Sequence, residues 1–108
     1  MAATVINVEK SAQRAAEYLV METLHGEMDV ERHKKSVRNL VEAGFPKIWL
    51  DFSPMHAVSS DTINFLLWCE MECLRSNVSL GLRNVSPDLL RIFRFSGLNQ
   101  VFEIHAHG

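Results

Sequence analysis

The chain has 108 residues, a formal net charge of −2, and an ordinary balance of 47% hydrophobic and 22% charged residues. This length suits one domain, residues 1–108, and the composition excludes a disordered chain. The near-neutral charge gives no reason to expect nucleic acid as a partner. Because the sequence has no apolar run of roughly 20 residues and no signal-peptide pattern at its start, we expect a cytoplasmic protein without direct membrane insertion.

Apolar runs separated by turn residues predict the secondary structure in chain order. Five of these runs predict strands, at residues 5–8, 18–24, 47–52, 78–82 and 101–104. Three segments predict helices, at residues 29–42, at residues 60–76, and from Ser86 to Gly97. The strand at residues 47–52 is almost continuously apolar, which predicts a central strand buried on both faces.

Capping residues support the helix predictions. Asp29 fits the N-cap of the first helix, and Gly44 follows its end. Ser86, followed by Pro87 and Asp88, is a strong helix start. Strands joined by helices run parallel, whereas the first two predicted strands lack such a connection. The order of elements therefore predicts a small α/β domain with a mixed sheet.

Two serines at the start of the longest predicted helix are the main functional signal. Ser59 and Ser60 follow a short loop after the strand at residues 47–52. The unpaired N–H groups and the positive dipole end of a helix N-terminus suit a capping hydroxyl and equally suit a phosphate. Asp61 is directly adjacent and would repel a phosphate. Capping and phosphorylation both remain open from these residues alone.

The long helix is apolar on two sides. One stripe, expected to face the core, contains Ile63, Leu66, Leu67 and Leu74. Phe65 and Trp68 project largely to the other side, and Glu70 falls near the middle of the stripe. Such a helix is either deeply buried or covered by a partner. We expect Phe65 and Trp68 to be partly exposed contact residues, with burial in the core as the alternative.

Residues with catalytic or metal-binding chemistry are few. Cys69 and Cys73 share a helix face and are expected to be buried small apolar residues, without a disulfide or zinc. His56 precedes the serines, but neither an orienting acid nor an oxyanion-hole motif accompanies it. His105 and His107 are expected to lie in solvent at the end of the chain. We therefore expect neither an enzyme nor a cofactor or metal site.

Several segments resemble the STAS domain family, which includes anti-sigma factor antagonists and cytoplasmic domains of sulfate transporters. Gly26-Glu-Met-Asp29 is similar to the family's Gly-Glu-Leu-Asp, and Ile48-Trp-Leu-Asp-Phe-Ser53 is similar to its Val-Leu-Asp-Leu-Ser strand. The matches to the closing helix and strand are Val85-Ser86-Pro87, Leu90, Phe93, Gly97-Leu98 and Val101-Phe-Glu-Ile104. The resemblance covers residues 24–104 and implies a STAS-like mixed sheet of four to five strands flanked by helices.

The resemblance also implies that the loop before the long helix carries the function. There the family typically has Asp-Ser-Ser-Gly-Leu, in which an anti-sigma factor with kinase activity phosphorylates a serine or threonine and thereby breaks the complex. By spacing, this motif falls on residues 59–63, with Ser60 at the phosphoacceptor position. Ser59 stands in place of the acid, Asp61 in place of the second serine, and Thr62 in place of the glycine.

Two functional hypotheses follow from the resemblance. The first is an anti-sigma factor antagonist-like regulatory module that binds an anti-sigma factor or a related serine kinase and is phosphorylated on Ser60. Ser59 would be a second site or the helix cap. The residues expected to contact the partner or shape its choice are Asp61, Thr62, Phe65 and Trp68. The alternative, which the altered motif favours, is a non-switching STAS subunit of a multi-STAS signalling complex or of a membrane transporter; a homodimer also stays open.

Overall fold

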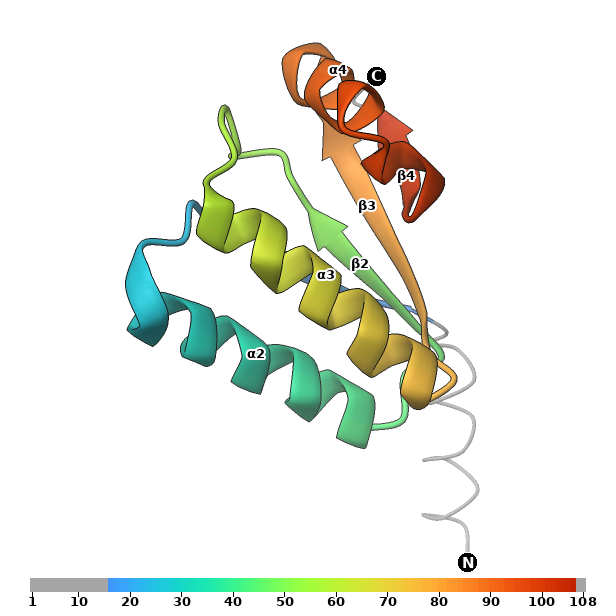
Figure 1. Cartoon of the computed structure of the whole chain (residues 1–108). Coiled ribbons are helices and arrows are strands. Elements are labelled where there is room, and N and C mark those ends of the chain that lie inside the picture. The colour runs from blue at the N-terminus through green and yellow to red at the C-terminus, as the bar shows by residue number, and fades with distance from the viewer. Residues whose placement is uncertain (1–15, 107–108) are drawn as a thin grey trace, which may run out of the picture.

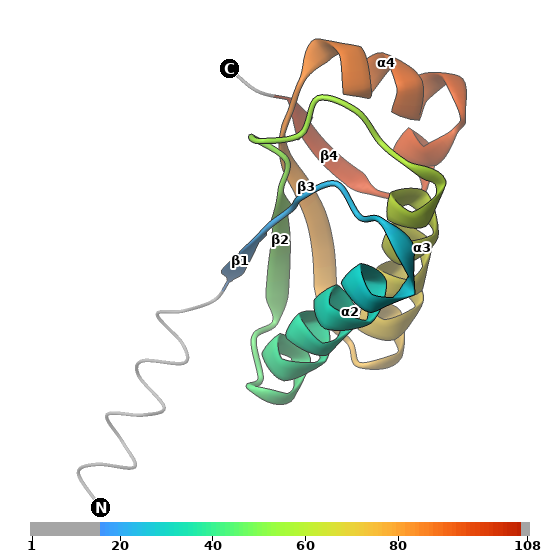
Figure 2. The same cartoon turned by 90° about the vertical axis from the view of Figure 1, so that its left-hand side faces the viewer.

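The computed structural model describes residues 16–106, which form a four-stranded parallel sheet with three α-helices on one face (Figure 1, Figure 2). The strands are β1 (Glu17–Val20), β2 (Lys47–Asp51), β3 (Ser79–Val85) and β4 (Glu103–Ala106), in this order across the sheet. The helices α2 (Gly26–Glu42), α3 (Ser60–Arg75) and α4 (Pro87–Phe95) connect successive strands, and a 3₁₀ turn, η1 (Leu98–Gln100), precedes β4. The predicted α/β class and helix-flanked sheet are confirmed.

All four described strands run parallel. Each neighbouring pair is joined by a helical crossover, which is the connection that parallel strands require. The strand predicted at residues 5–8, on which the mixed character of the sheet depended, lies outside the described residues.

The helical layer covers the face of the sheet that carries the core. On β2, Ile48 and Leu50 are fully buried under the helices, while Lys47, Trp49 and Asp51 alternate with them and are only half-buried. The predicted burial of this strand on both faces is therefore wrong among the described residues, because their three α-helices lie on one side (Figure 2). The opposite side is called here the outer face of the sheet.

Trp49 lies flat on this outer face. It is the register partner of Gly81 on β3, and its indole ring occupies the space where a side chain at position 81 would project. Lys47 and Arg83 approach the ring, with the Nζ and Cζ atoms 4.2 and 5.2 Å from its centroid. Glycine at position 81 is thus required by the packing of the tryptophan rather than by backbone conformation.

Strand β1 is shorter than the apolar run at residues 18–24 predicts. The Met21 N–H donates to the Asp51 carbonyl over 2.8 Å, and the chain then leaves the sheet toward α2. Met21 and Leu24 are nonetheless fully buried. Their apolar character therefore reflects two side chains of a loop that continue the core beyond the strand, while Glu22 and Thr23 between them are exposed.

Helix α2 begins three residues before the predicted cap. Asp29 is not the N-cap; its carboxylate instead accepts the N–H of His25, the capping position, over 3.0 Å. The Gly26 N–H donates to the carboxylate of Asp61, at the start of α3 (2.9 Å). Since side chains of two later residues satisfy these donors, the helix extends to Gly26 without a capping side chain at its first position.

The second half of the chain follows the prediction closely. Helix α3 begins at Ser60 and α4 at Pro87, each after a serine cap. Strand β3 continues past the predicted end at residue 82 to Val85, with a register shift against β4. Helix α4 joins the same core, because the rings of Phe52 and Phe93 meet edge to face at 6.0 Å.

Candidate functional site

Ser59 is the N-cap of α3, and its hydroxyl is fully engaged. The Oγ atom accepts the Thr62 N–H over 3.1 Å and donates to the Leu24 carbonyl over 3.0 Å. It also lies 3.0 Å from the Thr62 hydroxyl, which is fully buried. Because the single proton of Ser59 goes to Leu24, the Thr62 hydroxyl donates to Ser59. The hydroxyl of Ser59 is therefore fully used by the cap and by its bonds to the Leu24 carbonyl and the Thr62 hydroxyl.

Ser60 is different, although it is the next residue. It is the first residue of α3 and is exposed. Its hydroxyl makes no hydrogen bond to any other residue between 16 and 106. The first turn of a helix presents unpaired N–H groups and the positive end of the helix dipole. The hydroxyl of Ser60 is accordingly accessible at a place that tolerates an added anion.

Asp61 fixes a negative charge beside Ser60. Its half-buried carboxylate accepts the Gly26 N–H over 2.9 Å, which joins the start of α3 to the start of α2. A phosphate on Ser60 would feel repulsion from this carboxylate and attraction from the N-termini of two helices.

A stripe of exposed side chains continues from Ser60 along α3, with the polar Asn64 first and apolar residues after it. Its members, called here the α3 stripe, are Asn64, Leu67, Met71 and Leu74. Their spacing of three or four residues places them on the same helix face as Ser60. Leu67, Met71 and Leu74 are 40%, 59% and 68% exposed. The predicted burial of Leu67 and Leu74 is wrong, and an exposed apolar stripe of this kind is typical of a protein-binding surface.

The side of α3 expected to be exposed faces α2 instead. Phe65 is fully buried, with its ring edge to face against His33 at 5.8 Å, so its predicted exposure is wrong. Trp68 is half-buried and stacks on Phe65 at 6.2 Å, and Lys34 and Arg38 of α2 lie 5.2 and 5.1 Å from its ring centroid. The charged groups of both side chains therefore lie over the aromatic ring and make cation–π contacts with it.

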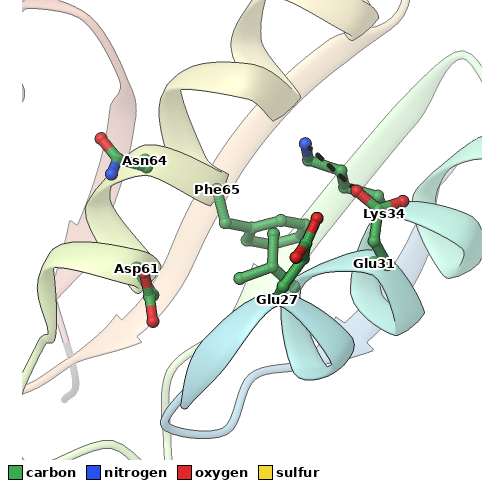
Figure 3. Close-up of a pocket in the computed structure, with 7 residues that line it drawn as sticks. Glu27, Glu31, Lys34, Asp61, Asn64 and Phe65 are labelled. Carbon is green, nitrogen blue, oxygen red and sulfur yellow. Dashed lines mark ion pairs between the residues drawn. The ribbon is translucent and has the colours of Figure 1, made fainter.

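A groove separates the starts of α2 and α3 (Figure 3). It has a volume of about 300 Å³ and is called here the acidic groove. It is lined by Glu27, Val30, Glu31 and Lys34 of α2 and by Asp61, Asn64 and Phe65 of α3. Three carboxylates meet one ammonium group in this lining, and the ammonium of Lys34 lies 3.7 Å from the Glu31 carboxylate. The groove therefore carries a net negative charge next to Ser60.

Sequence reasoning missed two members of the α3 stripe. Asn64 and Met71 were not singled out, although they lie one and three helical turns after Ser60. Apolar periodicity could not decide which side of α3 is buried, because both sides are apolar. The deciding residues are the cations of α2 that cover Trp68, and they come from another helix.

Ionisable groups on the remaining sides of α3 are not reactive. Cys69 and Cys73 are free and buried, as predicted. Burial raises the pKa of Cys73 to about 11 and that of Cys69 further, so both thiols stay protonated at neutral pH. Glu70 is half-buried, and burial also raises the pKa of its carboxyl.

The structure brings no catalytic or metal-binding cluster to this loop. His56 is exposed and makes no hydrogen bond to Ser59 or Ser60. Between residues 16 and 106, no three His, Cys, Asp or Glu side chains converge on a metal site. His105 is exposed and contacts the Glu103 carboxylate at 2.8 Å, while His107 lies outside the described residues. Across the same range, every helix is too short or too polar to span a bilayer.

The family match and the similar solved structures agree with the fold described above. The sequence matches the STAS domain over residues 11–107. No curated protein sequence matches the chain.

Solved structures with a similar fold share little sequence with the chain. A crystal structure of a candidate anti-sigma factor antagonist from Thermotoga maritima has a TM-score of 0.71 at 16% identity, over 84% of this chain and 79% of that one. The NMR structure of the same protein has a TM-score of 0.74 at 16% identity, over 85% and 74%. A sulfate transporter family protein from Wolinella succinogenes has a TM-score of 0.70 at 16% identity, over 86% and 78%.

Proposed function

The chain belongs to the STAS domain family, and we propose that it is an anti-sigma factor antagonist-like binding module controlled by phosphorylation of Ser60. Its partner in this proposal is an anti-sigma factor with serine kinase activity, or a related serine kinase, in the cytoplasm. The observation that carries the proposal is the contrast between the two serines: Ser59 is used as a helix cap, whereas Ser60 is exposed at the head of the α3 stripe.

The α3 stripe supplies the docking surface in this proposal. The unphosphorylated chain buries Leu67, Met71 and Leu74 against the kinase, with the hydroxyl of Ser60 at the edge of the contact. Phosphorylation adds a charge of roughly −1.5 to −2 at that edge. The partner would have to desolvate this charge at the edge of an apolar contact. Phosphorylation therefore weakens the complex.

The other predicted site residues act indirectly in this scheme. A phosphate on Ser59 would disrupt its hydrogen bonds to Leu24 and Thr62, so we assign Ser59 to the cap. Thr62 is buried and influences the partner only through this cap. Trp68 is half-buried and stacks on Phe65, which supports the helix from the core.

The phosphorylation step is tested by co-expressing the chain with each serine kinase from its native genome, followed by intact-mass measurement and site mapping. Ser60→Ala is compared with Ser76→Ala, which removes another exposed serine at the far end of α3. We expect one phosphate on the unmodified sequence and on the Ser76→Ala chain, and none on the Ser60→Ala chain. An unmodified chain with every kinase, or a phosphate that persists after Ser60→Ala, contradicts the proposal.

The docking step is tested with the kinase identified in this way. Ser60→Asp places a charge at the edge of the apolar contact, and Met71→Ser removes an apolar side chain from its centre. We therefore expect each variant to bind the kinase about tenfold more weakly, or more weakly still, in calorimetric titrations. Val20→Ser removes an exposed apolar side chain from β1 and serves as the matched control. Equal weakening by Val20→Ser would place the interface elsewhere.

A second candidate function is a non-switching STAS subunit of a larger assembly, such as a multi-STAS complex or a membrane transporter. Asp61 supports it, because the carboxylate that follows the acceptor position is already bound to Gly26 and opposes a phosphate. A sulfate transporter family protein shares the fold. In this case an assembly partner would bind the Ser60→Asp chain as tightly as the unmodified one.

A further inference from the structure

The most exposed large apolar side chain between residues 16 and 106 lies on α4, away from the site described above. Phe95 is 95% exposed, and Ile92, one turn earlier, is 47% exposed. The two side chains border a shallow hollow of about 300 Å³ that Arg91 and Ser96 complete. A single exposed apolar residue needs no explanation. Two on one helix face, beside a hollow, indicate a contact surface.

This surface is basic as well as apolar. Arg91 and Arg94 flank Phe95 and are both exposed. Within the described residues Arg91 has one ion-pair partner, Asp88, at 4.0 Å, and that carboxylate is itself exposed. The four residues Arg91, Ile92, Arg94 and Phe95 are called here the α4 patch. The positive charge of the two arginines favours a binding partner with an acidic surface.

A symmetric contact of this patch with itself is unfavourable. A two-fold axis through Phe95 would bring Arg91 and Arg94 of one copy toward the same arginines of the other. Like charges at the centre of an interface oppose association. The occupant of the α4 patch therefore comes from a surface of opposite charge.

The acidic groove between α2 and α3 is such a surface on the same chain. Glu27, Glu31 and Asp61 give it negative charge, and Val30 and Phe65 provide apolar atoms in its lining (Figure 3). Its volume of about 300 Å³ offers room for a protruding side chain. Figure 1 shows α4 and the paired starts of α2 and α3 in different parts of the molecule, so one copy can present each surface to a different neighbour.

We propose that the α4 patch of one copy docks into the acidic groove of a second copy. Phe95 enters the groove, and Arg91 and Arg94 face the carboxylates of Glu27 and Glu31. The contact is heterologous, because the two partners use different surfaces. Self-association can therefore continue beyond a dimer, either into a ring or into a longer chain. The proposal does not depend on phosphorylation or on a kinase.

Charge reversal of each surface separately gives the sharpest test. One variant carries Arg91→Glu and Arg94→Glu, and the other carries Glu27→Arg and Glu31→Arg. All four side chains are exposed, so we expect both variants to fold. Circular dichroism checks that they do. Sedimentation at low salt, where charges are least screened, measures self-association. We expect each variant alone to associate at least about tenfold more weakly than the unmodified chain. An equimolar mixture should associate again, because acidic and basic surfaces then match between the two variants.

Phe95→Ser tests the apolar part, with Val20→Ser on β1, outside both proposed surfaces, as the matched control. We expect Phe95→Ser to reduce self-association and Val20→Ser to leave it unchanged. Three results would each overturn the proposal: an unmodified chain that stays monomeric at every concentration, self-association that survives both charge reversals, or a mixture of the two variants that fails to associate.

Discussion

The starts of α3 and α4 are built alike but are used differently. Ser59 accepts the Thr62 N–H over 3.1 Å, and Ser86 accepts the Leu89 N–H over 3.3 Å, each from the capping position. After Ser86 the chain continues with Pro87, which has no N–H to satisfy and a fixed φ. After Ser59 it continues with Ser60, whose hydroxyl is exposed. Capping therefore gives one serine at each helix start a structural role, whereas Ser60 has none.

The two starts also differ in how far their hydrogen bonds reach. Ser86 bonds within its own first turn, whereas Ser59 also bonds the carbonyl of Leu24, which lies before α2. Asp61 adds a second connection to the same region through Gly26. The start of α3 is thus fixed to the start of α2, and Ser60 is presented on a rigid support.

Among the variants that test this comparison, we expect Ser59→Ala to cause the largest loss of stability. The change removes the cap, the bond to Leu24 and the acceptor of the buried Thr62 hydroxyl, and we expect a loss of about 2 kcal/mol in the free energy of unfolding. Ser86→Ala removes the cap alone and should cost roughly 1 kcal/mol or less. Urea denaturation of both variants measures the difference. Equal losses would show that the long-range bonds of Ser59 add nothing.

A smaller effect is expected from Asp61→Ala. It leaves the Gly26 N–H without its partner and separates the starts of α2 and α3, for which we expect a loss of about 1 kcal/mol. Asp88→Ala, at the corresponding place in α4, removes a highly exposed carboxylate that interacts with the helix dipole and pairs with Arg91 at 4.0 Å, for which we expect a loss of roughly 0.5 kcal/mol. The same urea titrations give both values, and a larger loss for Asp88→Ala would reverse the ranking.

Ser60→Ala should hardly change stability. Its hydroxyl is exposed and bonds no described residue, so the free energy of unfolding should stay within about 0.5 kcal/mol of the original value. Thermal denaturation followed by circular dichroism is sufficient to measure it. A loss comparable to that of Ser59→Ala would assign Ser60 a structural role and remove the main support for its regulatory one.

The start of helix α2 extends the comparison of helix starts, because its contribution to stability depends on pH. It has no capping side chain at His25, and the His25 N–H donated to the Asp29 carboxylate, together with Arg32, lowers the pKa of Asp29 below its usual 3.8. Because the folded-state pKa is depressed, this contribution is present above pH 3.8 and is lost as pH falls through the folded value. Asp29→Asn should therefore make unfolding less dependent on pH in this acidic range, as measured by urea midpoints. An unchanged pH dependence would show that this half-buried carboxylate does not contribute to stability.

The sequence patterns predicted the positions of the helices and strands better than they predicted which side chains are exposed. The start of α4 was readable from Ser86, Pro87 and Asp88 because all its capping interactions are local. The start of α2 was placed too late because Asp61, far away in the sequence, accepts the Gly26 N–H. No local rule can anticipate such a bond.

Exposure on α3 and β2 depended on neighbours that local sequence does not reveal. Phe65 is buried because α2 packs on that side of α3, which leaves Leu67 and Leu74 in solvent. On β2, Trp49 is apolar but lies on the outer face, where Lys47 of the same strand and Arg83 of β3 approach its ring. In both elements apolar residues on two sides made the buried side ambiguous.

The two tryptophans occupy opposite sides of the sheet, and each can serve as a separate optical reporter. Trp68 is stacked on Phe65 within the helical layer, while Trp49 lies over Gly81, with the ring of His105 at 5.1 Å. Trp49→Phe leaves a fluorophore that follows the helices, and Trp68→Phe leaves one that follows the outer face. Coinciding unfolding curves would mean that both sides are lost in one cooperative step. An earlier change at Trp49 would mean that the outer face loosens while α2 and α3 remain packed.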